Sequence, residues 1–141
     1  MQDISKIYTD GGARGKPGPA AAAFVVLKDG GVLIKHSEFL GIATNNEAEY
    51  KALAMALSWL VDNQKLFQNS KISFFLDSEL VVRQVTGLYK VKSEKLKLLI
   101  IKIKALEKRI TDVEIKYNIV RREKNKLADK LVNLKLDENP M

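Results

Sequence analysis

The sequence predicts an α/β domain built on a five-stranded mixed sheet, with a three-stranded antiparallel meander first and two further strands joined through helices. Three observations predict this fold. The first forty residues contain alternating and apolar runs around glycines, which is typical of β-structure. A helical periodicity begins after Thr44. Beyond it, short apolar runs alternate with amphipathic segments, as in proteins whose helices flank a sheet.

The meander is predicted from three apolar segments. IYTD closes the first strand, AAAAFVVLK at 20–28 is the second, and VLIKHSEFL at 32–40 is the third. Gly30 and Gly31 are interpreted as a two-residue turn between the last two strands.

The remainder of the chain is predicted to alternate helices with two strands. ISFFLD at 72–77 is continuously apolar, as expected of a strand covered on both faces. A stripe of Leu and Ile at helical spacing favours core packing over a partner site. Residues 1–141 are expected to form a single domain, with about 136–141 as a frayed tail. The other predicted elements are a helix through about Asp62, a helical segment at 78–85, a helix carrying the stripe over 96–110, a strand at 113–120 and a helix at 124–136.

Composition limits the classes of protein that the chain can represent. The absence of cysteine excludes disulfides and thiolate metal sites. No apolar run approaches the roughly 18 residues that span a bilayer, and the N-terminus lacks the character of a signal or transit segment. We expect a soluble cytoplasmic protein without a membrane partner.

Positive charge is concentrated in the second half of the chain. The net charge is +7; residues 1–70 carry 7 Lys/Arg and 7 Asp/Glu, whereas residues 71–141 carry 17 and 10. The densest part is YKVKSEKLKLLIIKIK at 89–104. This asymmetry favours a polyanionic partner, nucleic acid first, although a lysine-rich solvated surface explains the charge alone equally well.

Two glutamates near the start of the first helix, in TNNEAEY, lie on different helical faces. With Thr44 as N-cap, Glu47 is the third helical residue and completes a capping box, in which its carboxylate reaches back to a backbone N–H. Glu49 shares the apolar face with Leu53 and Leu60. A buried carboxylate must meet a cation or keep its proton. A distant salt bridge or a position at the rim of the core are the structural alternatives.

Three aspartates occur in comparable places. Asp10 ends the first strand before two glycines that let the backbone approach a ligand, Asp77 ends the strand at 72–77, and Asp129 lies in KLADKL on the last helix. Any one of them could simply cap or pair. Because ligands bind at the carboxyl ends of strands in open sheets, Asp10, Asp77 and Glu49 are expected to converge. Acids without His or Cys suit Mg²⁺ or Mn²⁺, and two such ions can serve phosphodiester cleavage.

Four motifs in order resemble the type 1 ribonuclease H family over nearly the whole chain. They are YTDGGARGKPGPA, TNNEAEYKAL, LDSELVVRQVTGLYKVK and REKNKLADKLVN. The resemblance implies the ribonuclease H-like fold. It also implies that the acids of these motifs, Asp10, Glu49, Asp77 and Asp129, bind two metal ions, Mg²⁺ or Mn²⁺, and are catalytic.

The resemblance further implies an endonuclease that hydrolyses the RNA strand of RNA–DNA hybrids and leaves a 3′-hydroxyl and a 5′-phosphate, acting as a monomer. It places two sets of residues on the hybrid. The minor groove, where 2′-hydroxyls distinguish RNA from DNA, would be lined by Gly11, Asn45 and Asn46. Phosphates would be held by Arg14 and Thr44 on the DNA strand and by Tyr89, Lys90 and Lys92 in the segment GLYKVK.

Two departures from the family pattern have consequences. Many members carry a histidine shortly before the last aspartate, where this chain has VRREKNKLAD; its one histidine, His36, is expected on a surface strand. Neither Arg122 nor Lys124 is a base at pH 7, so slower turnover or a higher pH optimum is expected. The chain also lacks a long basic protrusion after Lys92, which predicts lower affinity for the hybrid.

Two other functions stay open at this point. A DNA-processing nuclease or transposase-like enzyme could share the fold, because fold does not fix function. A non-catalytic hybrid or duplex binder would be favoured if the acids were incomplete. The TNN and GxYKVK segments argue against the first and the complete set of acids against the second.

Overall fold

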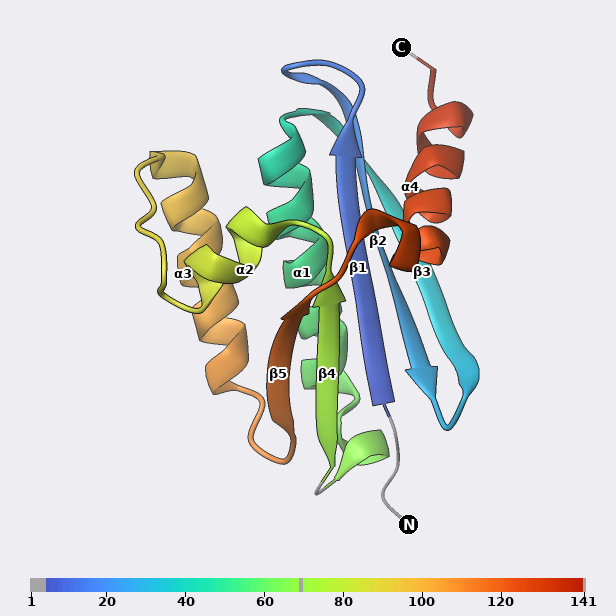
Figure 1. Ribbon diagram of the computed structural model, residues 1–141, viewed down its shortest axis with the longest axis vertical. Coiled ribbons are helices and arrows are strands. Elements are labelled where there is room, and N and C mark those ends of the chain that lie inside the picture. The colour runs from blue at the N-terminus through green and yellow to red at the C-terminus, as the bar shows by residue number, and fades with distance from the viewer. Residues whose placement is uncertain (1–4, 69, 141) are drawn as a thin grey trace.

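A computed structural model describes residues 5–68 and 70–140, and this part of the chain forms one five-stranded sheet in the order β3-β2-β1-β4-β5 (Figure 1). β1 runs antiparallel to β2, which runs antiparallel to β3, while β4 pairs parallel with β1 and β5 parallel with β4. The predicted mixed sheet is confirmed. Its strands are β1 (Ser5–Ala13), β2 (Gly18–Lys28), β3 (Gly31–Ala43), β4 (Lys71–Leu76) and β5 (Glu114–Ile119).

Helices cover both faces of the sheet (Figure 1). They are α1 (Asn45–Asp62), α2 (Glu79–Val85), α3 (Glu94–Lys108) and α4 (Lys126–Glu138), with short 3₁₀ turns η1 (Gln64–Phe67) and η2 (Arg122–Lys124). On β2, Phe24 and Val26 belong to the core under α1 and α3, whereas Ala21 and Ala23 pack against α4. This division follows from the period of two, which turns successive strand side chains to opposite faces.

The larger core lies between the sheet and the α1–α3 layer. α3 contributes Leu96, Ile103 and Leu106, which are buried in it. The apolar stripe of this helix is therefore core, as predicted. In the described part of the chain, none of the helices combines the length and the apolar character that a membrane crossing requires.

The hairpin between β2 and β3 turns one residue earlier than predicted. Its central residues are Asp29 and Gly30, both with left-handed backbone angles (φ 52° and 85°), and β3 starts at Gly31. Two consecutive positive φ values define the type I′ turn, for which Asp-Gly is a preferred pair. The Gly30–Gly31 turn is thus wrong by one position.

Three other expectations are corrected. β1 continues through Ala13 instead of ending at Asp10, because its later residues still pair with β2. One face of β4 is only half-buried, with Phe75 stacked on Tyr8 at a centroid distance of 4.9 Å. α4 continues through Glu138, so a frayed tail does not begin at 136, while Met141 lies outside the described residues.

Candidate active site

The register of two parallel strands brings the first two acids together. Thr9 of β1 is the partner of Leu76 of β4, and this is the last pair between the two strands. The residue that follows this pair is an aspartate in both segments: Asp10, still within β1, and Asp77, immediately after β4. Because parallel strands point the same way, both carboxyls lie at the same end of the sheet.

The third acid comes from α1, whose first turn begins where predicted. The Thr44 hydroxyl caps the helix by accepting a hydrogen bond from Glu47 N at 3.1 Å. The Glu47 carboxylate accepts from the same hydroxyl at 3.2 Å, and this bond replaces the predicted bond to a backbone N–H. Glu47 therefore serves the cap. Glu49 is on the buried face, where its Oε1 accepts a hydrogen bond from Gly11 N.

Glycine at position 11 is what allows this contact. A Cβ built on Gly11 would lie 2.2 Å from the backbone oxygen of Ala48. The strand can approach the first turn of α1 this closely only without a side chain. The glycine predicted to admit a ligand therefore admits the helix that carries Glu49.

Together the three acids form a compact cluster. Oxygen atoms of Asp10, Glu49 and Asp77 all lie within 4.8 Å of one another. Asp10 is 6% exposed and Glu49 is 7% exposed. The expected convergence of these residues is confirmed, and the structural alternatives for Glu49 do not describe its position.

Burial and mutual repulsion raise the pKa of two of these acids. Burial and the charge of Asp77 raise the pKa of Asp10 to about 7, against weaker lowering by hydrogen bonds to Glu49 and Gly11. Burial, then the charges of Asp10 and Asp77, raise the pKa of Glu49 well above its usual value. In the metal-free protein the Asp10–Glu49 pair consequently retains a proton near neutral pH.

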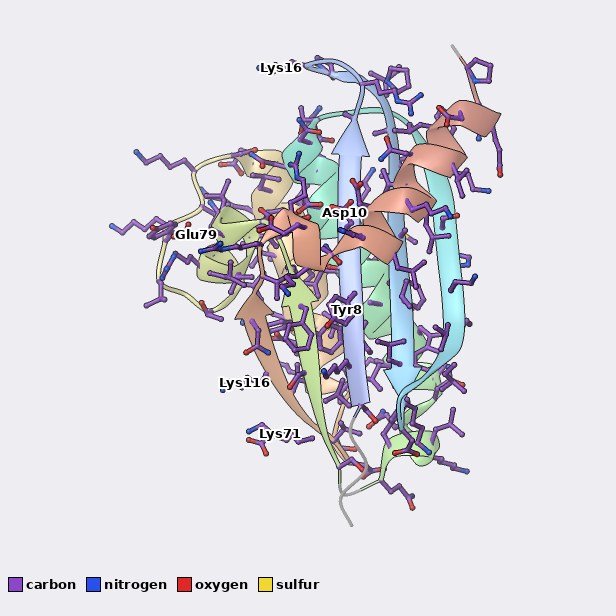
Figure 2. The ribbon with its side chains drawn as sticks, turned by 45° about the vertical axis from the view of Figure 1, so that its right-hand side comes forward. Tyr8, Asp10, Lys16, Lys71, Glu79 and Lys116 are labelled. Carbon is purple, nitrogen blue, oxygen red and sulfur yellow. The ribbon has the colours of Figure 1, made fainter. Side chains whose placement is uncertain are left out.

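Asp129 approaches from the opposite side, in the first turn of α4. It is half-buried and is not one of the three residues whose oxygens form the cluster. Its charge nevertheless contributes to raising the pKa of Asp10, which places it within electrostatic reach. Figure 2 shows Asp10 on β1 beside the start of α4, with Tyr8 farther down the same strand.

One residue at this site was not singled out from the sequence. Asn125 is 1% exposed, and its Nδ2 donates to Thr9 O at 2.8 Å and to Asp77 Oδ2 at 3.3 Å. The available signal was an asparagine at the second position of the helix predicted at 124–136, one turn before Asp129. Asparagine is common at helix N-termini as a cap, so the sequence offered a local explanation, although in the structure the Asn125 side chain makes no capping hydrogen bond.

Several of the residues predicted to contact the hybrid already have protein partners. Asn45 Oδ1 accepts from Ala13 N at 2.8 Å, and Thr44 caps α1. Arg14 pairs with Asp137 of α4 at 2.8 Å. Asn46 is exposed.

The segment that follows α2 is exposed and is tied to α1. The Tyr50 hydroxyl donates to Gln84 Oε1, and Gln84 Nε2 donates to Lys90 O at 3.3 Å. Tyr89 lies against the guanidinium of Arg83, with 5.7 Å from its ring centroid to the Arg83 carbon. The side chain of Lys92 is exposed, as a phosphate contact requires.

His36 lies on β3, as predicted. It is exposed, pairs with Glu38 at 3.0 Å and packs near Phe24. The positions before α4 hold exposed Arg121, Arg122 and Lys124. His36 therefore has a surface role, and the stretch before Asp129 contributes cationic side chains in place of an imidazole.

The chemistry of the cluster fits a hard divalent cation. All three members offer carboxylate oxygens, and the cluster includes no histidine or cysteine among the residues that the structure describes. Mg²⁺ and Mn²⁺ prefer such ligands, and a cation would relieve the repulsion that raises the pKa of Asp10. Asp10, Glu49 and Asp77 would hold it, with Asp129 nearby.

Comparison with known proteins agrees with the site. Residues 8–135 match the family model described as reverse transcriptase-like. The chain is 37% identical to ribonuclease HI of Halobacterium salinarum over 93% of its own length and 63% of the length of that protein. A bifunctional protein of Mycobacterium tuberculosis is also 37% identical, but the matched part is 35% of that protein. The chain thus spans less than two thirds of these curated relatives.

Solved structures match over almost their full length. LC11-RNase H1, isolated from compost by a metagenomic approach, superposes with a TM-score of 0.87 at 41% identity, covering 96% of each chain. A structure of LC11-RNase H1 in complex with an RNA/DNA hybrid superposes with a TM-score of 0.85 at 40% identity, covering 95% of this chain and 97% of the other.

The sheet order, the flanking helices and the acidic cluster define a protein with the ribonuclease H fold. The chain belongs to the reverse transcriptase-like family, within which it is a type 1 ribonuclease H-like protein.

Proposed function

We propose that the chain acts as a single-domain endonuclease that hydrolyses the RNA strand of RNA–DNA hybrids and leaves 3′-hydroxyl and 5′-phosphate ends. The observation that carries the proposal is the cluster of Asp10, Glu49 and Asp77, whose oxygens lie within 4.8 Å of one another where the parallel pairing of β1 with β4 ends. The similarity to LC11-RNase H1, whose structure with an RNA/DNA hybrid is known, supports the choice of substrate.

The four acids have complementary roles in this proposal. Asp10, Glu49 and Asp77 hold divalent cations, Mg²⁺ or Mn²⁺, and Asp129 adds a fourth carboxylate from α4. Two such ions, when bound, supply the activation of a water and the stabilisation of the leaving oxygen. The Gly11 N–H fixes the orientation of the Glu49 carboxylate, and burial beneath α1 limits the access of bulk water to it.

The surface around the acids supplies the substrate contacts. Gly11, Asn45 and Asn46 are proposed to face the minor groove, where 2′-hydroxyls are presented. Arg14 and Thr44 are proposed to hold a phosphate of the DNA strand, and Tyr89, Lys90 and Lys92 to hold further phosphates. Because Arg14 pairs with Asp137, it must exchange this partner for a phosphate when the hybrid binds.

The test is cleavage of labelled RNA–DNA, RNA–RNA and DNA–DNA duplexes in Mg²⁺, Mn²⁺ or EDTA. We expect cleavage of the RNA strand of the hybrid in either metal and none in EDTA. Asp77→Asn should remove this activity, whereas Asp62→Asn, at the exposed far end of α1, should not.

Two outcomes would contradict the proposal. Preferential cleavage of DNA–DNA duplexes would indicate a DNA-processing nuclease of the same fold. Metal-independent hybrid binding without any cleavage would indicate a binding module.

A further inference from the structure

Asn125 occupies a connecting position at the centre of the site. Its side chain is almost completely buried (1% exposed) at the junction of η2 and α4. Through its amide it contacts the strand carrying Asp10 and the carboxylate of Asp77. Through its backbone carbonyl it accepts the N–H of Asp129 at 3.1 Å, which is the first helical bond of the turn that presents this acid.

The amide contacts have a defined direction. Nδ2 donates to two oxygens, Thr9 O at 2.8 Å and Asp77 Oδ2 at 3.3 Å. A rotated amide would place Oδ1 against these two acceptors, so only the donor can face them. Oδ1 is itself buried and has no hydrogen-bond partner in the described part of the chain. A buried, unpaired oxygen is costly, so the side chain is placed for its two donations and not for full satisfaction of its own polar atoms.

These contacts link elements that are distant in the sequence. Thr9 immediately precedes Asp10, so the bond to Thr9 O fixes the start of α4 to β1. The bond to Asp77 fixes one carboxylate oxygen relative to the same point. Asp129 follows one helical turn later and moves with that start.

We propose that Asn125 is a positioning residue that sets the separation of Asp129 and Asp77 from Asp10, and thereby the affinity of the site for divalent cations. The inference rests on the proposed function only in the identity of the ligand. Residues that hydrogen-bond metal-ligating carboxylates orient them, and changing such residues typically lowers metal affinity by about 10- to 100-fold.

The experiment measures Mn²⁺ binding to the metal-free protein by electron paramagnetic resonance, without substrate. Asn125→Ala should raise the Mn²⁺ dissociation constant by about 10-fold, the lower end of that range, since Asn125 touches one of the carboxylates directly. The Mg²⁺ concentration for half-maximal hybrid cleavage should increase by a similar factor, with a smaller change in KM for the hybrid.

Asn63→Ala is the matched control. Asn63 also adjoins a helix end, and its Nδ2 donates to Trp59 O at 2.7 Å, at the end of α1 opposite to Glu49. It should lower the melting temperature while leaving the Mn²⁺ dissociation constant within about twofold of the wild type. A merely structural role of Asn125 predicts the same result for Asn125→Ala.

Wild-type Mn²⁺ affinity in folded Asn125→Ala, or an equal loss of affinity in Asn63→Ala, would overturn the inference. If Asn125→Ala does not fold, Asn125→Ser tests the same point with a shorter polar side chain, and unchanged metal affinity there has the same meaning. If Asn125→Ala lowers the metal affinity and the wild-type protein cleaves no hybrid, the inference stands and the proposed function is refuted. If the wild-type protein cleaves the hybrid and Asn125→Ala keeps the wild-type metal affinity, the proposed function stands and the inference is overturned.

Discussion

Ionisation of Asp10 should make the metal-free protein less stable as pH rises, and Asp10→Asn should remove this effect. The pKa of Asp10 is about 7 in the folded protein, against 3.8 for the free side chain, because burial and Asp77 oppose its charge. Between these two values the folded state binds more protons than the unfolded state. The free energy of unfolding therefore falls as pH rises from about 4 to about 7 and levels off above that window.

The magnitude follows from the displacement of the pKa. A shift from 3.8 to about 7 corresponds to about 4 kcal/mol if Asp10 titrates alone. Glu49 competes for the same proton, so part of this free energy belongs to the pair. We therefore expect the difference in the free energy of unfolding between Asp10→Asn and wild type, measured in EDTA, to increase by about 2 kcal/mol in favour of Asp10→Asn as pH rises from 4.5 to 8.5.

Urea unfolding in EDTA across this pH range measures the difference directly. Subtracting the two curves removes the contributions of acids outside the cluster, which both proteins share and which do not interact with Asp10. Glu47→Gln is the control, because its side chain serves the helix cap and it should keep the wild-type pH dependence. Parallel curves for wild type and Asp10→Asn would show that Asp10 is not forced to carry an unfavourable charge, and would refute the electrostatic account of the cluster.

Three further predictions concern neighbouring positions. Glu49→Gln should abolish metal-dependent cleavage while hybrid binding persists, whereas Glu47→Gln should cleave normally; the opposite pattern in a cleavage assay would refute the assignment of the two helix faces. Replacing Lys90 and Lys92 by Gln should weaken hybrid binding and reduce the log–log salt slope by about 2, and an unchanged slope in binding titrations would remove this segment from the substrate surface. Gly11→Ala should lower the free energy of unfolding by about 1–3 kcal/mol or more, because the new methyl group would meet backbone at 2.2 Å; wild-type stability in urea would contradict the close approach.

Local patterns were sufficient to predict the order of elements and the character of individual residues. The periodicity after Thr44 distinguished the face of Glu49 from that of Glu47, because side chains three and four residues apart share a helical face. The apolar stripe of α3 indicated its core face for the same reason. These features depend on neighbours along the chain, so a sequence can carry them.

The errors of the sequence analysis arose where a distant element determines a boundary. β1 continues beyond Asp10 because β2 still pairs with it, and the close packing of Gly11 against the backbone of α1 was not predicted. In the hairpin, Asp29 and Gly30 adopt the two left-handed conformations. The pairing register of β2 with β3 therefore decides that Asp29–Gly30 forms the turn and Gly30–Gly31 does not.

By itself the sequence determined which acids are present, which helical face carries Glu49, and that the chemistry suits a divalent cation. Only the tertiary structure decided how close the acids come, because the register of β1 against β4 and the approach of α1 to Gly11 are contacts between distant segments. It also decided the role of Asn125. An asparagine near the start of a helix has a local explanation as a cap, and only the folded chain brings its amide to Thr9 and Asp77.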